Sequence, residues 1–350
     1  MLVQPSTPVA APLESWRVFF PAAAALAVGG LGAWIAQLQG ATFGIAPRDH
    51  GAFMLWGVLG AGIHGFLLTA YAKQNDAPLP GRLLLLGLLG AQVLTAPLIL
   101  AGHAAAALLP WIVLLGWTLR VAIPSLRRRV DPTTAAVPAA VASGLVGLAV
   151  HVAGGDGTAI GVNAFVAPLA LAIVDRVLPF FSSRVTPGYV GGRLPWFIGP
   201  MVVLSWLRVT AWAPWAAAGL LILLARQAWG WRPWPAAKTP MILVLHLGVA
   251  WFAVAWVLAL AGAATSIVTH ALVVGGLGSL LLAISMRVVR GHGGLPLELG
   301  RTGVAVMALA QAAAVARISG APLWIAGALL VGAFSAWFIR FVRVCLPAPG

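Results

Sequence analysis

The sequence predicts an all-α protein, a polytopic membrane helical bundle, and three observations support this fold class. The 350 residues are 61% hydrophobic and only 8% charged, whereas about a quarter of the residues in soluble domains are charged. Apolar runs of about twenty residues, enough to cross a bilayer as a helix, recur along the chain. No polar stretch long enough for a soluble domain separates them. The lipid bilayer is therefore the expected surrounding medium.

Residues 1–350 are expected to form a single membrane domain. Residues 1–17 form a short cytoplasmic tail, the spans occupy about 18–342, and a short C-terminal tail follows. Arg17 precedes about twenty apolar residues, a longer run than the core of a signal peptide, so we interpret this segment as an uncleaved first span. The sequence shows no repeat of fixed period.

Hydropathy divides the chain into about twelve transmembrane helices. The expected spans are 18–38, 51–71, 83–102, 104–123, 135–153, 158–179, 196–211, 213–230, 240–261, 264–286, 302–318 and 321–342. Counted by loop, 18 of the 21 basic residues then lie on the side of the N-terminus, and only Arg48, Arg208 and Arg317 lie on the other. Because cytoplasmic loops collect Lys and Arg, this distribution predicts that both termini are cytoplasmic, N-in and C-in.

The net charge of +14 follows from the same loop bias and needs no polyanionic partner. The run Arg127, Arg128 and Arg129 lies in an inner loop, and we interpret it as a topogenic signal. The chain has no soluble module that could read a nucleic acid groove. No nucleic acid is therefore expected among the partners.

Cys345 is the only cysteine. A single thiol excludes an intrachain disulfide, a four-cysteine iron–sulfur cluster and a covalent CxxCH haem attachment. Carboxylates are also scarce, and Asp175 is the one that adjoins a span end, which disfavours a closed zinc site and a proton-coupled transporter. No phosphate-binding loop or serine-histidine-acid set stands out. Any cofactor must be held by histidine, methionine or oxygen atoms.

The seven histidines are the candidate ligands, and the topology gives each one a depth. The outer group is His50, His103, His151 and His270. The inner group is His64, His246 and His292. At 1.5 Å per residue, His50 and His64 are about 21 Å apart along one helix, and His270 and His292 about 33 Å apart along another. Neither pair can bind one metal ion, so two ligands from the same pair would mean two sites.

Imidazole is the commonest protein ligand for haem iron and copper, and histidines on several spans are what a cofactor in a bundle core requires. Ionisable groups in the hydrocarbon region usually face a cavity or a partner. By depth, His64, His246 and His270 are therefore the best candidates. The alternative is a neutral imidazole that hydrogen-bonds a neighbouring helix, and this alternative is favoured for His103 and His151 at the water interface.

Three segments carry a resemblance to a known family. The first is HGAFMLWGVLGAGIHGFLLTA, from His50 to Ala70, followed by a PLPGR turn. The second is DRVLPFFSSR, from Asp175 to Arg184. The third runs from LHLGVAWFAVAW, beginning at Leu245, to THALVVGGLGSLLLAISMRVVRGHGG, which ends at Gly294. In this order and spacing the chain resembles the NnrS family of membrane proteins over nearly its whole length.

The resemblance implies a haem- and copper-containing protein of the bacterial inner (cytoplasmic) membrane that takes part in the nitric oxide response of denitrifying or nitrosatively stressed bacteria. It implies nitric oxide or another small diatomic ligand, and an electron-transfer partner. The positions that match family histidines are His50, His246, His270 and His292. Arg176 and Arg287 match family arginines near the inner face, where a guanidinium could pair with haem propionates. The alternative is that these two arginines only set the orientation of the chain in the membrane.

The chain departs from the family pattern directly after His50. The family's His-x-His-Glu element has Ala52 and Phe53 in place of the second histidine and the glutamate. Two alternatives follow: haem without copper, or copper bound with the help of His64. The candidate metal ligands are accordingly His50, His64, His246, His270 and His292.

The leading hypothesis is a haem-binding protein in which His270 and His50 form the outer ligand pair, and His246 with His292 or His64 the inner one. Two other functions stay open. A secondary transporter of a small solute would show a polar midplane pocket and broken helices. A haem or copper assembly factor would hold its metal transiently. The sequence leaves open whether the chain is an enzyme.

Overall fold

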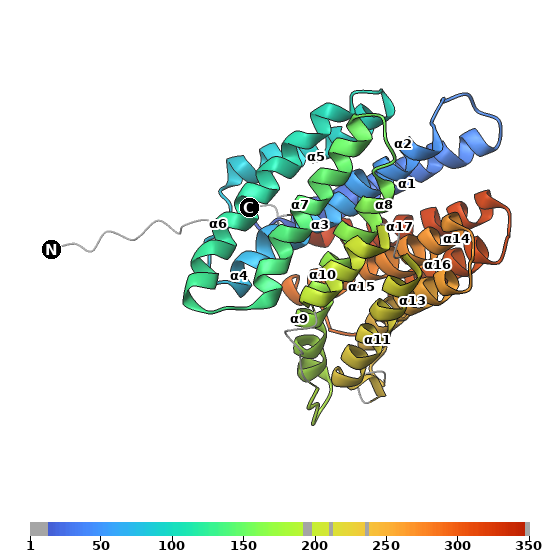
Figure 1. The fold of residues 1–350 in the computed structure, drawn as a ribbon. Coiled ribbons are helices and arrows are strands. Elements are labelled where there is room, and N and C mark those ends of the chain that lie inside the picture. Colours follow the sequence, from blue (N-terminus) through green and yellow to red (C-terminus); the bar gives the residue numbers. More distant parts are fainter. Residues whose placement is uncertain (1–12, 192–197, 210–212, 235–237, 347–350) are drawn as a thin grey trace.

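The computed structural model describes residues 13–191, 198–209, 213–234 and 238–346, and all regular elements within them are helical. Ten helices in this part of the chain are long and apolar enough to cross a membrane. They are Trp16–Leu38, Pro47–Gln74, Arg82–Leu100, Ala104–Arg128, Pro132–Val152, Thr158–Val185, Pro240–Leu260, Thr265–His292, Gly300–Ile318 and Leu323–Cys345. The prediction of an all-helical, multi-pass membrane chain is therefore confirmed, and Figure 1 shows the bundle.

The ten helices correspond to ten of the twelve predicted spans. The other two predicted spans overlap α10 (Ile198–Val209), with 12 residues, and α11 (Ala213–Gly230), with 18. At 1.5 Å per residue, α10 is only about 18 Å long and too short to cross a bilayer by itself. The ends of the predicted span 196–211 lie outside the described residues, as do residues 1–12 of the predicted cytoplasmic tail. The count of twelve stays a prediction.

Three helices of 28 residues form the centre of the bundle, and we call them the first, second and third long helix. The first comprises α2, η1, α3, η2 and α4 (Pro47–Gln74), the second α8, η4 and α9 (Thr158–Val185), and the third α14, η6 and α15 (Thr265–His292). They are the most enclosed of the ten, with 89%, 78% and 67% of their most apolar window buried. Helices that are largely enclosed by protein can carry functional side chains away from lipid.

Each long helix contains a π-helical segment in its N-terminal half, which the predicted topology places on the outer side of the membrane. The words outer and inner are used below in the sense of this predicted topology. The segments are η1 (Phe53–Leu59), η4 (Gly161–Val166) and η6 (Ala271–Gly278), and the first long helix has a second one, η2 (Leu67–Tyr71). π-Helical turns are rare and frequently mark functional sites. Three of them lie at the same level of the bundle, and the space between them is therefore a candidate functional site.

The helices repeat as three units of four, which the sequence did not reveal. Each unit consists of a first helix, a long helix and two further helices. The first unit is α1 (Trp16–Leu38), the first long helix, α5 (Arg82–Leu100), and η3 with α6 (Ala104–Arg128). The second is α7 (Pro132–Val152), the second long helix, α10 and α11, and the third is α13 (Pro240–Leu260), the third long helix, α16 (Gly300–Ile318) and α17 (Leu323–Cys345). The long helices begin at residues 47, 158 and 265, so the spacing is 111 and 107 residues.

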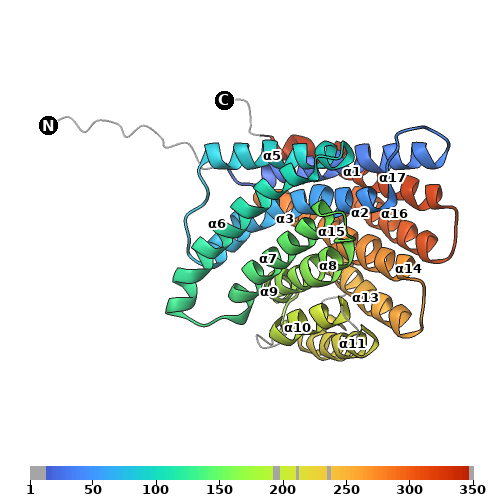
Figure 2. The same ribbon diagram turned by 45° about the horizontal axis from the view of Figure 1, so that its top comes forward.

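The packing follows the same repeat. In every unit the first helix packs on the long helix, and the third helix packs on its π-helical segment. The last helix of each unit then packs on the first helix of the next, as α6 on α7, α11 on α13, and α17 back on α1. Figure 2 shows the resulting closed ring, with the long helices in the middle. Contacts of η4 with both η1 and η6 bring the three π-helical segments together at the centre.

Helix starts and turns have local causes that the sequence contains. Pro47, Pro132 and Pro240 each occupy the first turn of a helix, where the missing N–H costs no hydrogen bond. The Asp131 carboxylate caps α7 by accepting a hydrogen bond from the backbone N–H of Thr133 (3.0 Å). After α13 the chain turns through Gly262, whose φ of 75° is the left-handed conformation that glycine adopts without strain.

The two ends of the described chain lie on the same side of the bundle. The guanidinium of Arg17, at the start of α1, donates hydrogen bonds to the carbonyl oxygens of Val344 (3.4 Å) and Cys345 (3.5 Å) at the end of α17. An even number of crossings requires this arrangement. It is compatible with ten crossings and with twelve.

Candidate cofactor site

The outer ends of the three long helices surround a cavity of about 440 Å³, which we call the outer cavity. Ligand cavities in proteins typically measure about 300–1,000 Å³. The first long helix contributes His50, the second Thr158, and the third His270, while α1, α16 and α17 complete the wall. Most of the lining is apolar, so these two imidazoles stand out as candidate metal ligands. The structure thus brings together the outer ligand pair that the sequence predicted.

His50 is positioned by the first turn of the first long helix. Pro47 begins this helix, and His50 lies three residues later, at the mouth of the cavity. Its ring stacks on the indole of Trp34 from α1, with ring centroids 4.4 Å apart and planes inclined by 16°. Within the described residues its ring nitrogens form no hydrogen bond to protein. The stacking fixes the ring plane and leaves the nitrogens free to bind a ligand.

His270 is held in a tautomer that suits a metal ligand. Its Nδ1 lies 2.7 Å from the carbonyl oxygen of Ser266, one turn earlier on the third long helix. Because a carbonyl can only accept, Nδ1 carries the proton and Nε2 keeps its lone pair in the neutral ring. Histidine ligands are commonly oriented in this way, by a hydrogen bond from the nitrogen that does not bind the metal.

Arg317, on α16, adds a positive charge to the outer cavity. Its Nη2 donates a hydrogen bond to the hydroxyl of Ser266 (2.6 Å), so the same turn of the third long helix orients both the imidazole and the guanidinium. We did not predict a site role for Arg317 from the sequence. The signal was nevertheless present, because Arg317 is one of only three basic residues on the outer side of the predicted topology.

The other two outer histidines do not line the outer cavity. His151 is buried, and its Nε2 lies 3.5 Å from the Asp49 carboxylate. His103 is exposed in the turn after α5. The contact of His151 with Asp49, on the first long helix, is of the kind that the sequence favoured for it, and for His103 the sequence interpretation stays a prediction.

At the inner end of the third long helix, His292 forms part of an ionic cluster. Its Nδ1 donates to the carboxylate of Glu14 (3.1 Å), which also accepts hydrogen bonds from Lys73 and from the indole N–H of Trp16. Burial by itself would raise the pKa of Glu14, but the hydrogen bonds from Lys73 and Trp16 and the charge of His292 outweigh it and lower the pKa below its ordinary value. The cluster ties α1 to the inner ends of the first and third long helices.

His64 lies in the packed interface between the first long helix, α1 and α6. Its side chain is fully buried, stacks on Phe19 (5.3 Å between centroids) and meets the edge of Trp111 (5.0 Å). Its Nδ1 lies 2.9 Å from the carbonyl oxygen of Gly60 on its own helix. The ring is packed between helices, while its Nε2 is buried without a hydrogen-bond partner among the described residues.

His246 is half-buried on α13, and its Nε2 is buried without a hydrogen-bond partner among the described residues. No hydrogen bond or ring contact joins it to His64 or His292 in the described part of the chain. None of the three lines the outer cavity or a smaller cavity that lies further inward between the long helices. The inner ligand pair therefore stays a prediction, whereas the two residues of the outer pair line one cavity.

The two predicted propionate partners differ in their surroundings. Arg176 forms an ion pair with Asp131 and donates a hydrogen bond to the side chain of Gln74 (3.2 Å). Arg287 is buried, and its guanidinium lies 4.6 Å from the centre of the Phe181 ring. Neither lines the outer cavity. The guanidinium that does so is that of Arg317.

The outer cavity contains donor groups that suit haem and donor groups that suit copper. Two imidazoles from different helices and a guanidinium are groups that hold haem iron and a propionate. Imidazole and thioether groups also bind copper, and Met54 lines the same cavity. Among the described residues, no group of three or more His, Cys, Asp or Glu side chains is placed to hold a metal ion. The replacement of the family's His and Glu by Ala52 and Phe53 agrees with this geometry.

Comparison with known proteins supplies the family. The family model described as NnrS protein matches residues 13–347, which is nearly the whole chain. No curated protein and no solved structure matches the chain. A match of this extent is decisive for membership, and it agrees with the three sequence segments described above. The chain belongs to the NnrS family.

Proposed function

We propose that this chain is a haem-binding protein of the bacterial inner membrane that handles or responds to nitric oxide. The observation that carries the proposal is that His50 and His270, from two different long helices, line one cavity of suitable size. His50 and His270 would hold haem there, and ferrous haem iron would supply the chemistry that binds a diatomic ligand. An electron-transfer partner belongs to the same proposal.

Each neighbouring group has a task in this site. Trp34 holds the ring plane of His50, and the Ser266 carbonyl keeps the proton of His270 on Nδ1, so that Nε2 is available. Arg317 offers its guanidinium to a propionate. The largely apolar remainder of the wall lowers the local dielectric, which strengthens these interactions.

The test is to purify the full chain after haem-replete expression and to record its absorption spectrum oxidised, reduced and with nitric oxide, together with a metal analysis. We expect a Soret band, iron in the sample and a spectral change with nitric oxide. No Soret band and no iron would overturn the proposal. Copper in the absence of iron would overturn the choice of haem over copper.

We also propose that α10 and α11 lie within the membrane, which gives twelve membrane-embedded helices with both termini in the cytoplasm. The three-unit repeat supports this, because α10 and α11 occupy the places of α5 with α6 and of α16 with α17. The bias of basic residues supports the orientation. Accessibility labelling of single cysteines placed in the loops, after Cys345→Ser, tests it, and labelling of the 127–129 loop from outside would contradict it.

The repeat also bears on the alternative of a secondary transporter. Many transporters consist of two repeats with broken helices that meet at a binding site near the midplane. Here the chain divides into three units, and the long helices continue through their π-helical segments without a break. Uptake of a labelled solute by proteoliposomes that contain no haem would favour the transporter. Substoichiometric haem that is lost on dilution would favour an assembly factor.

A further inference from the structure

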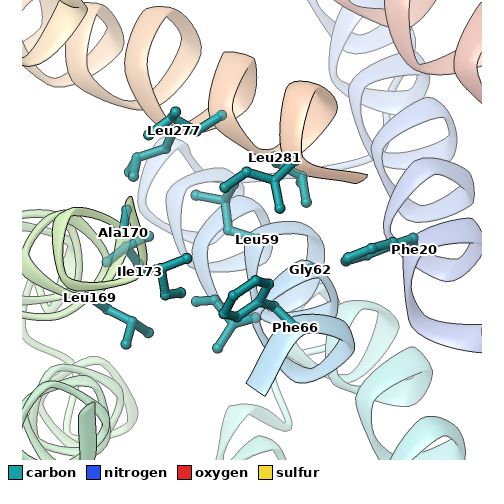
Figure 3. A pocket seen from close by; sticks show the side chains of 13 residues that line it. Phe20, Leu59, Gly62, Phe66, Leu169, Ala170, Ile173, Leu277 and Leu281 are labelled. Carbon is teal, nitrogen blue, oxygen red and sulfur yellow. The ribbon is translucent and has the colours of Figure 1, made fainter. Parts of the chain in front are cut away.

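A second cavity lies between the same three long helices, inward from the outer cavity, and we call it the apolar cavity. Figure 3 shows side chains of the three helices and Phe20 of α1 pointing into it. Its volume is about 60 Å³. Among its lining residues are Gly62, Phe66, Ala170 and Leu281.

The three long helices contribute equivalent positions to this cavity. Each supplies four residues at positions i, i+3, i+4 and i+7, which form one face of a helix. These series begin at Leu59, Val166 and Leu277. The series start 107 and 111 residues apart, close to the spacing of the units. The apolar cavity is therefore built by the repeat and lies at its centre.

The chemistry of the lining restricts the ligand. All the lining side chains are hydrocarbon, and Gly62 contributes none. A water molecule needs polar partners and about 10–15 Å³, so this cavity has the space for water but not the partners. Cavities of this kind stay dry and bind small apolar molecules such as xenon. This volume is sufficient for one molecule of diatomic dimensions.

The apolar cavity is one helical turn from the outer cavity on all three helices. Leu55, Val162 and Val273 line the outer cavity, and the residues four positions later on each helix begin the lining of the apolar cavity. These turns lie within η1, η4 and η6. The three π-helical segments thus form the partition between the two cavities, and only apolar side chains stand in it at these positions.

We propose that the apolar cavity binds one small, uncharged, apolar molecule of the size of a diatomic gas and holds it one turn from the outer cavity. Binding itself depends only on the shape and chemistry of the apolar cavity. The assignment of the cavity as a holding site for nitric oxide on its way to His50 and His270 rests on the function proposed above.

The first experiment uses xenon as the probe. Crystals of the full chain are pressurised with xenon, and the anomalous signal gives the site and its occupancy. We expect one xenon atom between Gly62, Ala170 and Leu281. Diffraction data that show no xenon there, at pressures that fill other apolar cavities, would overturn the proposal whether or not haem is bound.

Variants that change the cavity in opposite directions sharpen this test. Ala170→Phe places a ring in the cavity, and we expect the xenon occupancy to fall at least about fivefold. Leu281→Ala enlarges it, so occupancy at the same pressure should equal or exceed that of the wild type. Ala250→Phe makes the same substitution as the first variant on an exposed face of α13 and should change occupancy less than about twofold. Equal occupancy in all three would contradict the assignment.

The second experiment tests the link to the outer cavity. In the haem-loaded protein, Ala170→Phe should slow the association of nitric oxide several-fold while the Soret maximum stays unchanged, because the ligands of the outer cavity are untouched. An unchanged association rate would limit the proposal to xenon-type binding and overturn the holding role. A protein that binds no haem would refute the function proposed above, and the xenon result would remain valid.

Discussion

The outer and inner ends of the long helices both carry histidines and arginines, yet they use them differently. At the outer end, His50 and His270 line a cavity, and their neighbours orient them without occupying the nitrogen needed for a metal. At the inner end, His292 is paired with Glu14, and Arg176 with Asp131. Membrane depth alone therefore does not make a histidine a ligand. An adjoining space and a free nitrogen are also required.

The largest effect is expected when an outer ligand is removed. His50→Ala deletes an imidazole from the outer cavity, and we expect haem affinity to fall more than about a hundredfold, since loss of a group that only orients a metal ligand already costs about 10–100-fold. His103→Ala, at an exposed outer position, is the matched control and should retain haem. Haem titration followed at the Soret band measures both. Equal affinity in the two variants would show that the outer cavity is not the site.

Substitutions of the arginines at the two ends should also differ in their effect on haem binding. Arg317→Gln removes the guanidinium of the outer cavity, and we expect about tenfold weaker haem binding, because hydrogen bonds to charged groups contribute about 1.5–3 kcal/mol. Arg176→Gln breaks the ion pair with Asp131, so it should lower the melting temperature while haem affinity is retained. Titration and thermal unfolding of both variants provide the comparison. The reverse pattern would assign the propionate partner to the inner face.

His64 tests whether a buried histidine outside a cavity matters for haem. His64→Phe keeps an aromatic ring between Phe19 and Trp111, and it removes the hydrogen bond to Gly60. We expect unchanged haem and metal content and a melting temperature within a few degrees of the wild type, because swaps of similar volume usually cost less than about 1.5 kcal/mol. Loss of copper or iron from this variant would show that His64 is a ligand.

Acidification should give the smallest effect, at the inner cluster. The pKa of Glu14 is lowered in the folded protein, so its ionised carboxylate stabilises the folded state. This stabilisation is fully present above the ordinary pKa of the carboxyl group and is lost as the pH falls through the lowered pKa of the folded protein. We expect Glu14→Gln to melt about 2 °C or less below the wild type at pH 7. This difference should vanish near pH 3, and Asp76→Asn, on an exposed turn, should show none. A difference that grows on acidification would contradict the role of the ionised carboxylate.

Hydropathy predicted most of the fold because each membrane-spanning helix is a continuous run of apolar residues in the sequence. The ten helices begin and end within six residues of the predicted spans, and the largest differences are at the inner ends of the second and third long helices. Their last turns contain polar residues such as Arg184 and Arg290, which hydropathy assigns to loops. The three-unit repeat was not predictable in this way. It consists of packing partners more than a hundred residues apart, and the aligned positions retain only their apolar character.

The site was predictable in part. Depth along the helices correctly separated His50 from His64 and His270 from His292, and it paired the two residues that share the outer cavity. Depth carries no information about the direction in which a side chain points. His64 is two residues from Gly62, about 200° around the helix, and so it faces α1 and α6 while Gly62 faces the apolar cavity. Such orientation requires the packing of the neighbouring helices.

The most direct measurement compares two histidines on one helix. His270 and His292 lie at opposite ends of the third long helix, one at the outer cavity and the other beside Glu14. Both are replaced by alanine in separate variants, and the ratio of Soret absorbance to protein is measured after identical purification. We predict that His270→Ala loses its haem and that His292→Ala retains it. Retention by His270→Ala together with loss by His292→Ala would contradict the outer site.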